Sequence, residues 1–133
     1  MIRDNYRRAV PSVGVYHGIV QEAIKKTRSM LTPWGRKRQF LARWGEELFK
    51  EAYAYIPQST VADLTHHAAL YLSAQGVCLR LNTHDGLVLE VLNTFSEIER
   101  WKEAAHKAFG VPLLLGGDVL EMQVKVEDGR EWK

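Results

Sequence analysis

Apolar residues in the first half of the chain recur every three or four positions, which is the spacing of one helix face. This pattern predicts a helix over 11–30 and a second helix over 44–55. Pro57 lacks the backbone N–H that a continuing helix needs, so we expect it to interrupt the second helix. A third helix is predicted over 60–75, and Gly76 is expected to end it.

The periodicity changes from helical to alternating after Gly76. In 77–82 every second residue is apolar, and a further apolar run covers 87–91, so both segments are predicted strands. Asp85 and Gly86 stand between them, and Asp-Gly between two such runs favours a two-residue turn. We therefore expect an antiparallel β-hairpin with this dipeptide at its tip.

Two further elements are predicted toward the C-terminus. Thr94 followed by Glu97 is typical of a capping box, here at the start of a helix over 96–109 that Gly110 is expected to end. In 119–127 apolar and polar residues alternate, as in a half-buried antiparallel strand. Helices followed by a hairpin, a helix and a strand indicate an α+β fold, with helices packed on a small antiparallel sheet.

Length and composition narrow the class of protein. A single domain over 1–133 is expected, because no repeat or linker interrupts the pattern. A hydrophobic content of 46% with 26% charged residues is typical of a globular protein and excludes a disordered chain. No apolar run approaches a membrane span, and the charged first residues lack the apolar core of a signal peptide. A cytoplasmic protein without a membrane partner is therefore expected.

Charge is distributed unevenly along the chain, although the net charge is only +2. Residues 1–50 carry eleven Lys and Arg against four Asp and Glu, whereas 51–133 carry seven against twelve. A basic half and an acidic half indicate one surface for a polyanion and another for a different ligand, such as cations. A solvated surface of mixed charge is the alternative.

The basic half contains three consecutive cations, Arg36, Lys37 and Arg38, with Arg43 close behind. They are predicted to lie in a short hairpin or loop, because Pro33 ends the preceding helix. Cations clustered in this way bind backbone phosphates, and the arginine fork suits phosphate oxygens particularly well. A solvated run of charges is the alternative, so the residues alone leave the role open.

Asp85 at the predicted hairpin tip has two interpretations. In the first, it is present only because its short side chain tolerates a tight turn. In the second, the hairpin holds a carboxylate for Mg²⁺, which takes one or two protein carboxylates together with waters and substrate phosphates. His84 beside it can then donate to a phosphate or sugar oxygen. The local sequence leaves both interpretations open.

Four segments together resemble the DNA polymerase I-like, or family A, DNA polymerases. LTPWGRKRQF is similar to the family's T-x-x-G-R-R-R segment, and EAYAYIPQSTVAD is similar to N-x-P-x-Q-G-T-A-A-D, which begins its primer–template helix. LRLNTHDGLVLEV resembles motif C, and VPLLLGGDVLEMQVKVEDGREW resembles the closing strand of the palm subdomain. The segments occur in the family's order and look most like phage members. The resemblance implies the C-terminal part of a polymerase palm, working in a host cytoplasm if it is phage-encoded.

The resemblance gives roles to the residues that match the family's motifs. Asp85 falls on the motif C aspartate, which helps bind two catalytic Mg²⁺ ions, and His84 falls on the histidine beside the primer terminus. Gln58 matches a glutamine that approaches the minor groove of the duplex. Lys50 stands where the family often has arginine, so it keeps the charge and loses the bidentate fork. Gly86 replaces the usual glutamate, which removes a second carboxylate.

The resemblance also implies what must come from elsewhere. Motif A, with the family's other metal-binding aspartate, and motif B, which grips the incoming dNTP, both precede the matched segments in the family. Nucleotidyl transfer needs two cations about 3.5–4 Å apart, which one aspartate does not readily assemble. We therefore expect a DNA-directed DNA polymerase that needs primer–template DNA and a second polymerase chain. The alternatives are a non-catalytic nucleic-acid-binding module derived from the palm, and a structural α+β protein.

Overall fold

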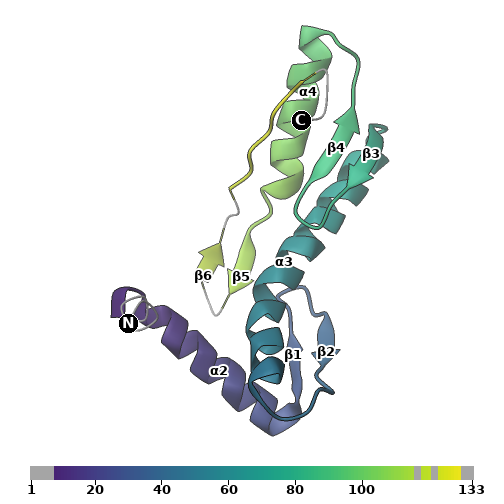
Figure 1. Ribbon diagram of the computed structural model, residues 1–133. Helices are drawn as coiled ribbons and strands as arrows, with labels where there is room; N and C mark the ends of the chain where they lie inside the picture. Colours follow the sequence, from purple (N-terminus) through teal and green to yellow (C-terminus); the bar gives the residue numbers. More distant parts are fainter. Residues whose placement is uncertain (1–7, 116–117, 121–122, 130–133) are drawn as a thin grey trace. The chain divides into compact units, whose positions relative to one another are not determined.

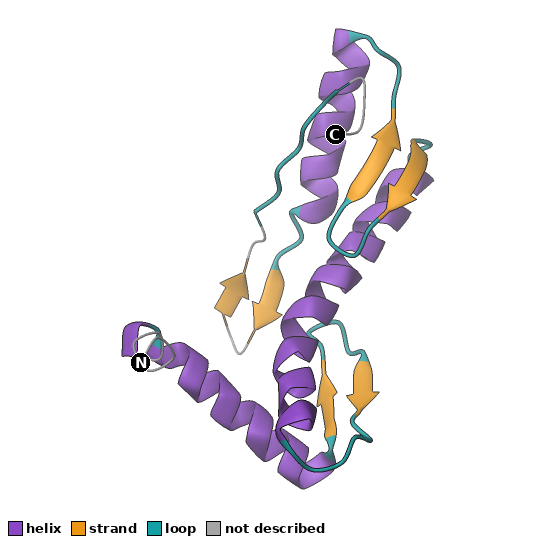
Figure 2. Cartoon of the chain, viewed as in Figure 1, coloured by secondary structure: helices purple, strands orange, loops and turns teal. Residues whose placement is uncertain are grey.

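The computed structural model describes residues 8–115, 118–120 and 123–129, and each helix in it is followed by a β-hairpin (Figure 1; Figure 2). The helices are α2 (Pro11–Thr27), α3 (Glu46–Ala74) and α4 (Phe95–Phe109), and the strands are β1 (Ser29–Leu31), β2 (Lys37–Gln39), β3 (Cys78–Asn82), β4 (Leu87–Glu90), β5 (Leu113–Leu115) and β6 (Asp118–Leu120). The α+β class is confirmed. Within the described residues each strand pairs only with its neighbour in sequence, so separate antiparallel hairpins replace the single sheet that was expected.

The chain turns sharply from α2 into β1 at Arg28. This residue has a φ of 51°, and its N–H donates to the Ile24 carbonyl at 3.0 Å, which closes the helix. Left-handed backbone is uncommon for a residue other than glycine. The Arg28 guanidinium holds it there by donating to the backbone carbonyls of Phe40 and Ala42. The helix predicted over 11–30 is thus confirmed, and it ends three residues early.

The hairpin expected around the three cations is present. Pro33 occupies the second position of a tight turn in which the Gly35 N–H donates to the Thr32 carbonyl at 2.9 Å. Gly35 has a φ of +82°, a conformation that glycine adopts at little cost. The register pairs Leu31 with Lys37, and successive residues of β2 point to opposite faces of the hairpin.

The helix α3 runs without a break through Pro57, so the predicted interruption is wrong. A proline inside a helix leaves the carbonyl four residues earlier without its N–H donor. Here that carbonyl belongs to Tyr53, and the Tyr16 hydroxyl of α2 donates to it at 2.9 Å. A side chain from another helix thus replaces the missing backbone donor. The helices predicted over 44–55 and 60–75 are one helix.

The hairpin of β3 and β4 is confirmed, but its turn lies one residue earlier than expected. The Thr83 N–H donates to the Gly86 carbonyl at 2.9 Å, which leaves His84 and Asp85 as the two central turn residues. Gly86 lies outside this pair, directly before β4. Because neither central residue has a positive φ, the turn is not of the types that favour Asp-Gly.

The β3–β4 hairpin contains a β-bulge at Arg80. The register changes between Leu79 and Leu81, so Arg80 has no residue of its own opposite it on β4. The extra residue turns Leu81 away from the face of Leu79, and 47% of Leu81 is exposed. The Arg80 guanidinium forms an ion pair with Glu90 across the hairpin. The alternation predicted for this strand therefore holds only as far as the bulge.

The helix α4 begins and ends close to the predicted positions. The Thr94 hydroxyl accepts a hydrogen bond from the Glu97 N–H at 3.4 Å. The Glu97 carboxylate accepts a hydrogen bond from the Trp101 indole at 3.2 Å instead of returning to the cap. Gly110 is required after the last turn, because a Cβ there would lie 2.9 Å from the His106 carbonyl oxygen.

The last predicted strand is present only in part. β6 ends at Leu120, and 121–122 lie outside the described residues. Residues 123–129 are not in a strand, although their apolar side chains remain less exposed than the polar ones between them. The prediction of a strand over 119–127 is therefore wrong in its second half, where alternation occurs without strand pairing.

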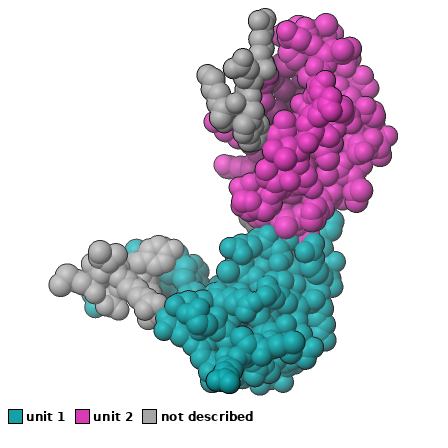
Figure 3. Space-filling view, turned by 45° about the vertical axis from the view of Figure 1, so that its right-hand side comes forward, with its two compact units in different colours: residues 1–59 teal, residues 60–133 magenta. Residues whose placement is uncertain are grey.

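The chain divides into two compact units, unit 1 (residues 1–59) and unit 2 (residues 60–133), each with its own core (Figure 3). The core of unit 1 consists of Val20, Ile24, Phe40, Leu48, Ala52 and Tyr55, and that of unit 2 of Ala68, Leu72, Val77, Trp101 and Ala108. The helix α3 contributes to both cores, and the single domain over 1–133 stays a prediction. No helix within the described residues is long and apolar enough to cross a membrane.

Candidate nucleic-acid interface and candidate metal centre

His84 and Asp85 occupy the tip of the β3–β4 hairpin. Their side chains are 90% and 64% exposed, and His84 Nε2 lies 3.7 Å from Asp85 Oδ2. The Thr83 hydroxyl lies 3.3 Å from Asp85 Oδ1 and 3.0 Å from the Gly86 carbonyl, and it can donate to either. The turn therefore presents a carboxylate that retains lone pairs for a ligand from solvent.

Asp85 can supply one ligand to a hard cation. Within the described part of the chain, no three His, Cys, Asp or Glu side chains lie close enough together to hold a metal ion. Mg²⁺ needs few protein ligands, because waters and substrate phosphates complete its octahedron. One exposed carboxylate at the tip therefore matches the small number of protein ligands that Mg²⁺ takes.

The three consecutive cations of the β1–β2 hairpin do not share one face. Arg38 is opposite Met30 in the register and forms an ion pair with Glu51. Its guanidinium carbon also lies 5.1 Å from the ring centre of Phe40 and 5.7 Å from that of Tyr55, within the range of cation–π attraction. Arg38 is therefore engaged with the core of unit 1, which its position in a run of cations does not reveal.

Lys37 and Arg43 face solvent. Both are exposed, and neither has an ion-pair partner among the residues that the structure describes. Arg36 is also exposed, and its backbone carbonyl accepts a hydrogen bond from the Tyr55 hydroxyl at 3.0 Å. Lys37 and Arg43 can therefore meet a phosphate without breaking an internal contact.

Lys50 and Gln58, the predicted DNA contacts on α3, are both exposed. They are separated by about 12 Å along the helix axis, at a rise of about 1.5 Å per residue. The Lys50 ammonium lies 3.1 Å from Glu47 and 3.4 Å from Glu46, and hydrogen bonds to these carboxylates raise its pKa above the ordinary 10.5. A phosphate must compete with both carboxylates for Lys50, whereas Gln58 stands open to a ligand.

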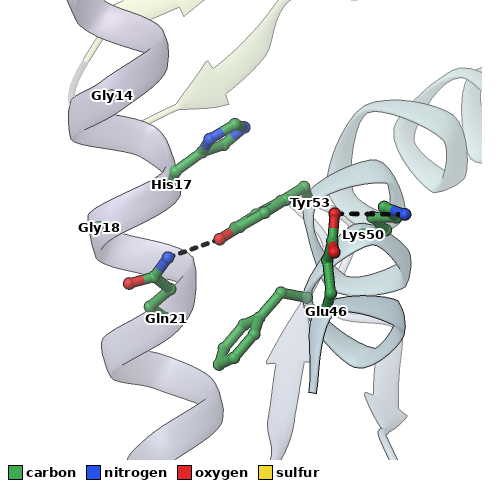
Figure 4. Close-up of a pocket in the computed structure, with 8 residues that line it drawn as sticks. Gly14, His17, Gly18, Gln21, Glu46, Lys50 and Tyr53 are labelled. Carbon is green, nitrogen blue, oxygen red and sulfur yellow. Dashed lines mark hydrogen bonds and ion pairs between the residues drawn. The ribbon is translucent and has the colours of Figure 1, made fainter.

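A groove between α2 and α3 in unit 1 has a volume of about 640 Å³ (Figure 4). Gly14, His17, Gly18, Gln21, Glu46, Phe49, Lys50 and Tyr53 line it. The Tyr53 ring stacks on the His17 imidazole, with centres 3.9 Å apart and planes at 17°, and Gln21 Nε2 donates to its hydroxyl at 2.6 Å. No motif in the sequence marks this cluster, because its members come together only when the two helices pack.

The chain was compared with protein-family models, with curated proteins and with solved structures, and none matches. The resemblance of the four segments to family A polymerases therefore rests on the residues themselves. The candidate residues fall into two groups: the cations and Gln58 belong to unit 1, and His84 and Asp85 belong to unit 2.

Proposed function

We propose that the chain is the C-terminal palm part of a family A DNA polymerase and contributes to template-directed nucleotidyl transfer in DNA replication. The observation that carries the proposal is the hairpin tip, where a tight turn presents the Asp85 carboxylate and the His84 imidazole together to solvent. This is the arrangement that the resemblance of LRLNTHDGLVLEV to motif C implies.

In this function the Asp85 carboxylate would help to hold the catalytic Mg²⁺ ions. When bound, these ions would supply activation of the primer 3′-hydroxyl and neutralisation of the dNTP triphosphate. Because the described residues form no cluster of three metal ligands, further ligands come from motif A of a second polymerase chain. That chain also supplies motif B to position the dNTP, and a misplacement of about 1 Å costs on the order of 100-fold in rate. The chain alone should be nearly inactive.

The primer–template contacts of the proposal belong to unit 1. Lys37 and Arg43 are exposed and free of ion pairs within the described part of the chain, so they are available to phosphates. Gln58 is exposed on α3, in the segment that resembles the start of the family's primer–template helix. Arg38 supports the hairpin from its inner face, and Lys50 contributes charge that it shares with two glutamates.

Exposed apolar side chains support the need for a partner chain. Leu41 in unit 1 and Phe95 in unit 2 are each 83% exposed, and Leu70 and Leu92 are also largely exposed. Large apolar side chains on a surface often mark an interface, and they promote aggregation when the partner is missing. We therefore expect the chain to self-associate when it is expressed alone.

Primer extension tests the proposal. The chain is assayed with Mg²⁺, dNTPs and a primer–template, alone and mixed with a polymerase chain that carries motifs A and B. Extension should occur only in the mixture, and Asp85→Asn, which keeps a residue suited to turns, should reduce it by about 100-fold or more, because the reacting groups lose their positioning. Glu103→Gln, which removes an exposed carboxylate from α4, is the matched control and should leave extension unchanged.

Two outcomes would contradict the proposal. Extension that Asp85→Asn does not reduce would remove this carboxylate from the metal site. DNA binding without extension in any mixture would favour the non-catalytic nucleic-acid-binding module, in which Asp85 serves only the turn.

A further inference from the structure

Residues 23–45 carry seven cations and no carboxylate. The cations are Lys25, Lys26, Arg28, Arg36, Lys37, Arg38 and Arg43. The segment comprises the end of α2, the β1–β2 hairpin and the loop that leads to α3. A run of this length with charge of one sign produces a positive potential that attracts polyanions.

Internal contacts use some of these cations and leave others accessible. Arg28 donates to backbone carbonyls of the loop, and Arg38 is paired with a glutamate of α3. Lys37 and Arg43 are exposed and have no such contact among the described residues. Positive charge that is free to bind a ligand therefore lies on the outer face of β2 and in the following loop, and also at Lys26 near the end of α2.

Apolar side chains accompany these two cations. Lys37 lies directly opposite Leu31 in the register, so both project from the outer face of the hairpin, away from Arg38. Leu31 is exposed, and Leu41, just beyond β2, is more exposed still. A ligand that offered only phosphates would not explain why apolar side chains are exposed to solvent next to Lys37 and Arg43.

Trp44 adds an aromatic surface next to Arg43. Its ring meets the Phe49 ring nearly edge to face, with centres 5.2 Å apart and planes at 84°, and this contact restricts the orientation of the indole. Nevertheless, 54% of Trp44 is exposed. Trp34, in the turn of the same hairpin, is also exposed. The 31–44 segment thus combines cations with aromatic and aliphatic surface.

This combination matches single-stranded nucleic acid better than a duplex. Unpaired bases present faces that stack on aromatic side chains, while their phosphates follow a basic surface. A duplex hides the base faces in its own stack, and most of its contacts with proteins are made by phosphates and sugars. We propose that the 31–44 segment binds single-stranded DNA, with Lys37 and Arg43 at phosphates and Trp44 stacked on a base. The inference rests on the proposed function and deepens it, because it names the unpaired template as the ligand.

Fluorescence anisotropy of a labelled oligothymidylate tests this binding. It is measured in EDTA, so neither a metal nor catalysis contributes, and compared with a blunt duplex of the same length. The single strand should bind more tightly than the duplex. Trp44→Leu should weaken single-strand binding about 5- to 100-fold, as expected for the loss of one stacked base. Lys37→Gln should make the negative slope of log K against log salt shallower by about 0.7 for the single strand.

Three further variants keep the result interpretable. Phe95→Leu removes an exposed aromatic ring from unit 2 and should leave oligonucleotide binding unchanged. Trp44→Phe retains a ring, so it should bind the single strand more tightly than Trp44→Leu, and a thermal melt of each checks that both fold. Asp85→Asn should bind the single strand as the wild type does.

The two proposals fail in different ways. Duplex binding at least as tight as single-strand binding, or equal weakening of both by Trp44→Leu, would overturn the single-strand site. Single-strand binding that depends on Trp44, in a chain that supports no extension in any mixture, would uphold the site and overturn only the polymerase assignment.

Discussion

The two units of the chain differ in what fills their cores and in the sign of their charge. Residues 1–59 carry eleven Lys and Arg against five Asp and Glu, and large side chains such as Phe40 and Leu48 are fully buried there. Residues 60–133 carry seven against eleven, and their core combines small residues such as Ala68 with the large Trp101. The proposed polyanion-binding surface and the carboxylate tip thus belong to units that differ in charge and in the composition of their cores.

The two candidate sites are held by different kinds of contact. In unit 1 the hairpin that carries Lys37 is anchored from beneath, since Arg38 and Phe40 tie its inner face to the core. In unit 2 the tip that carries Asp85 is held by its own turn hydrogen bonds, and Leu87 and Leu89 of β4 pack against the core. The basic hairpin is thus anchored through a cation and an aromatic ring, and the acidic tip through aliphatic side chains.

The largest effect on stability is expected from substitution of Phe40, which is 1% exposed in the core of unit 1. Phe40→Ala should lower the free energy of unfolding by about 3–5 kcal/mol, because loss of a buried ring leaves a cavity. Amide hydrogen exchange should accelerate most in β1 and β2 and less in α4, whose side chains pack in the other core. Equal acceleration in α4 would contradict the separation of the units. Leu41→Ala, at an exposed neighbouring position, should change stability by less than about 0.5 kcal/mol.

A smaller effect is expected at the contact between α2 and α3. Tyr16→Phe should lower the free energy of unfolding by about 1 kcal/mol in urea denaturation, because the Tyr53 carbonyl loses the donor that replaces the one missing at Pro57. Tyr71→Phe in unit 2 is the matched control, since this hydroxyl has no hydrogen bond to the described residues. A loss no greater than that of the control would show that the Tyr16 hydroxyl does not support α3.

The same hydroxyl predicts a pH dependence in the alkaline range. Burial raises the pKa of Tyr16 above its ordinary value of 10.0, so the folded chain favours the neutral phenol. The resulting stabilisation is complete below pH 10 and is lost as the pH rises through the folded pKa. Tyr16→Phe should abolish this part of the alkaline loss of stability, whereas Tyr71→Phe should not.

The smallest effect concerns the ion pair that spans the β3–β4 hairpin. Arg80 holds the pKa of the Glu90 carboxyl below its ordinary value of 4.5, mainly through their hydrogen bond. The contribution of this ion pair to stability is complete above pH 4.5 and disappears as the pH falls through the pKa of Glu90 in the folded chain. In an NMR titration the Glu90 carboxyl should titrate below pH 4.5, and Arg80→Gln should return its midpoint toward 4.5. An unchanged midpoint would show that the pair does not persist in solution.

Much of the fold follows from local sequence, and the errors have particular causes. Helix α4 and both predicted hairpins were identified from caps, turns and periodicity that act within a few residues. Pro57 misled the prediction because its missing donor is replaced by a hydroxyl from another helix, and no local pattern reports that. The bulge at Arg80 was also not predicted, since an extra residue in a strand leaves the alternation of the sequence intact.

The sequence predicts which residues belong to the candidate site better than it predicts which way their side chains face. The run of cations gives no sign that Arg38 turns toward Phe40 while Lys37 faces solvent, because that division depends on which strand face meets the core. The exposed indole of Trp44 is equally invisible, since a tryptophan in a sequence is more often part of a core. The carboxylate of Asp85 was located at a tip from the sequence alone, one position from its actual place in the turn.

The hydrogen bond from Tyr16 to Tyr53 also has a consequence for the order of assembly. Before α2 docks, the segment that becomes α3 has an unfilled acceptor at Tyr53, four residues before Pro57. When α2 docks, the Tyr16 hydroxyl donates to this carbonyl. The helix α3 therefore becomes continuous when α2 packs against it. Completion of the longest helix and packing of the first one are then a single cooperative event, and a φ-value at Tyr16 should report on both.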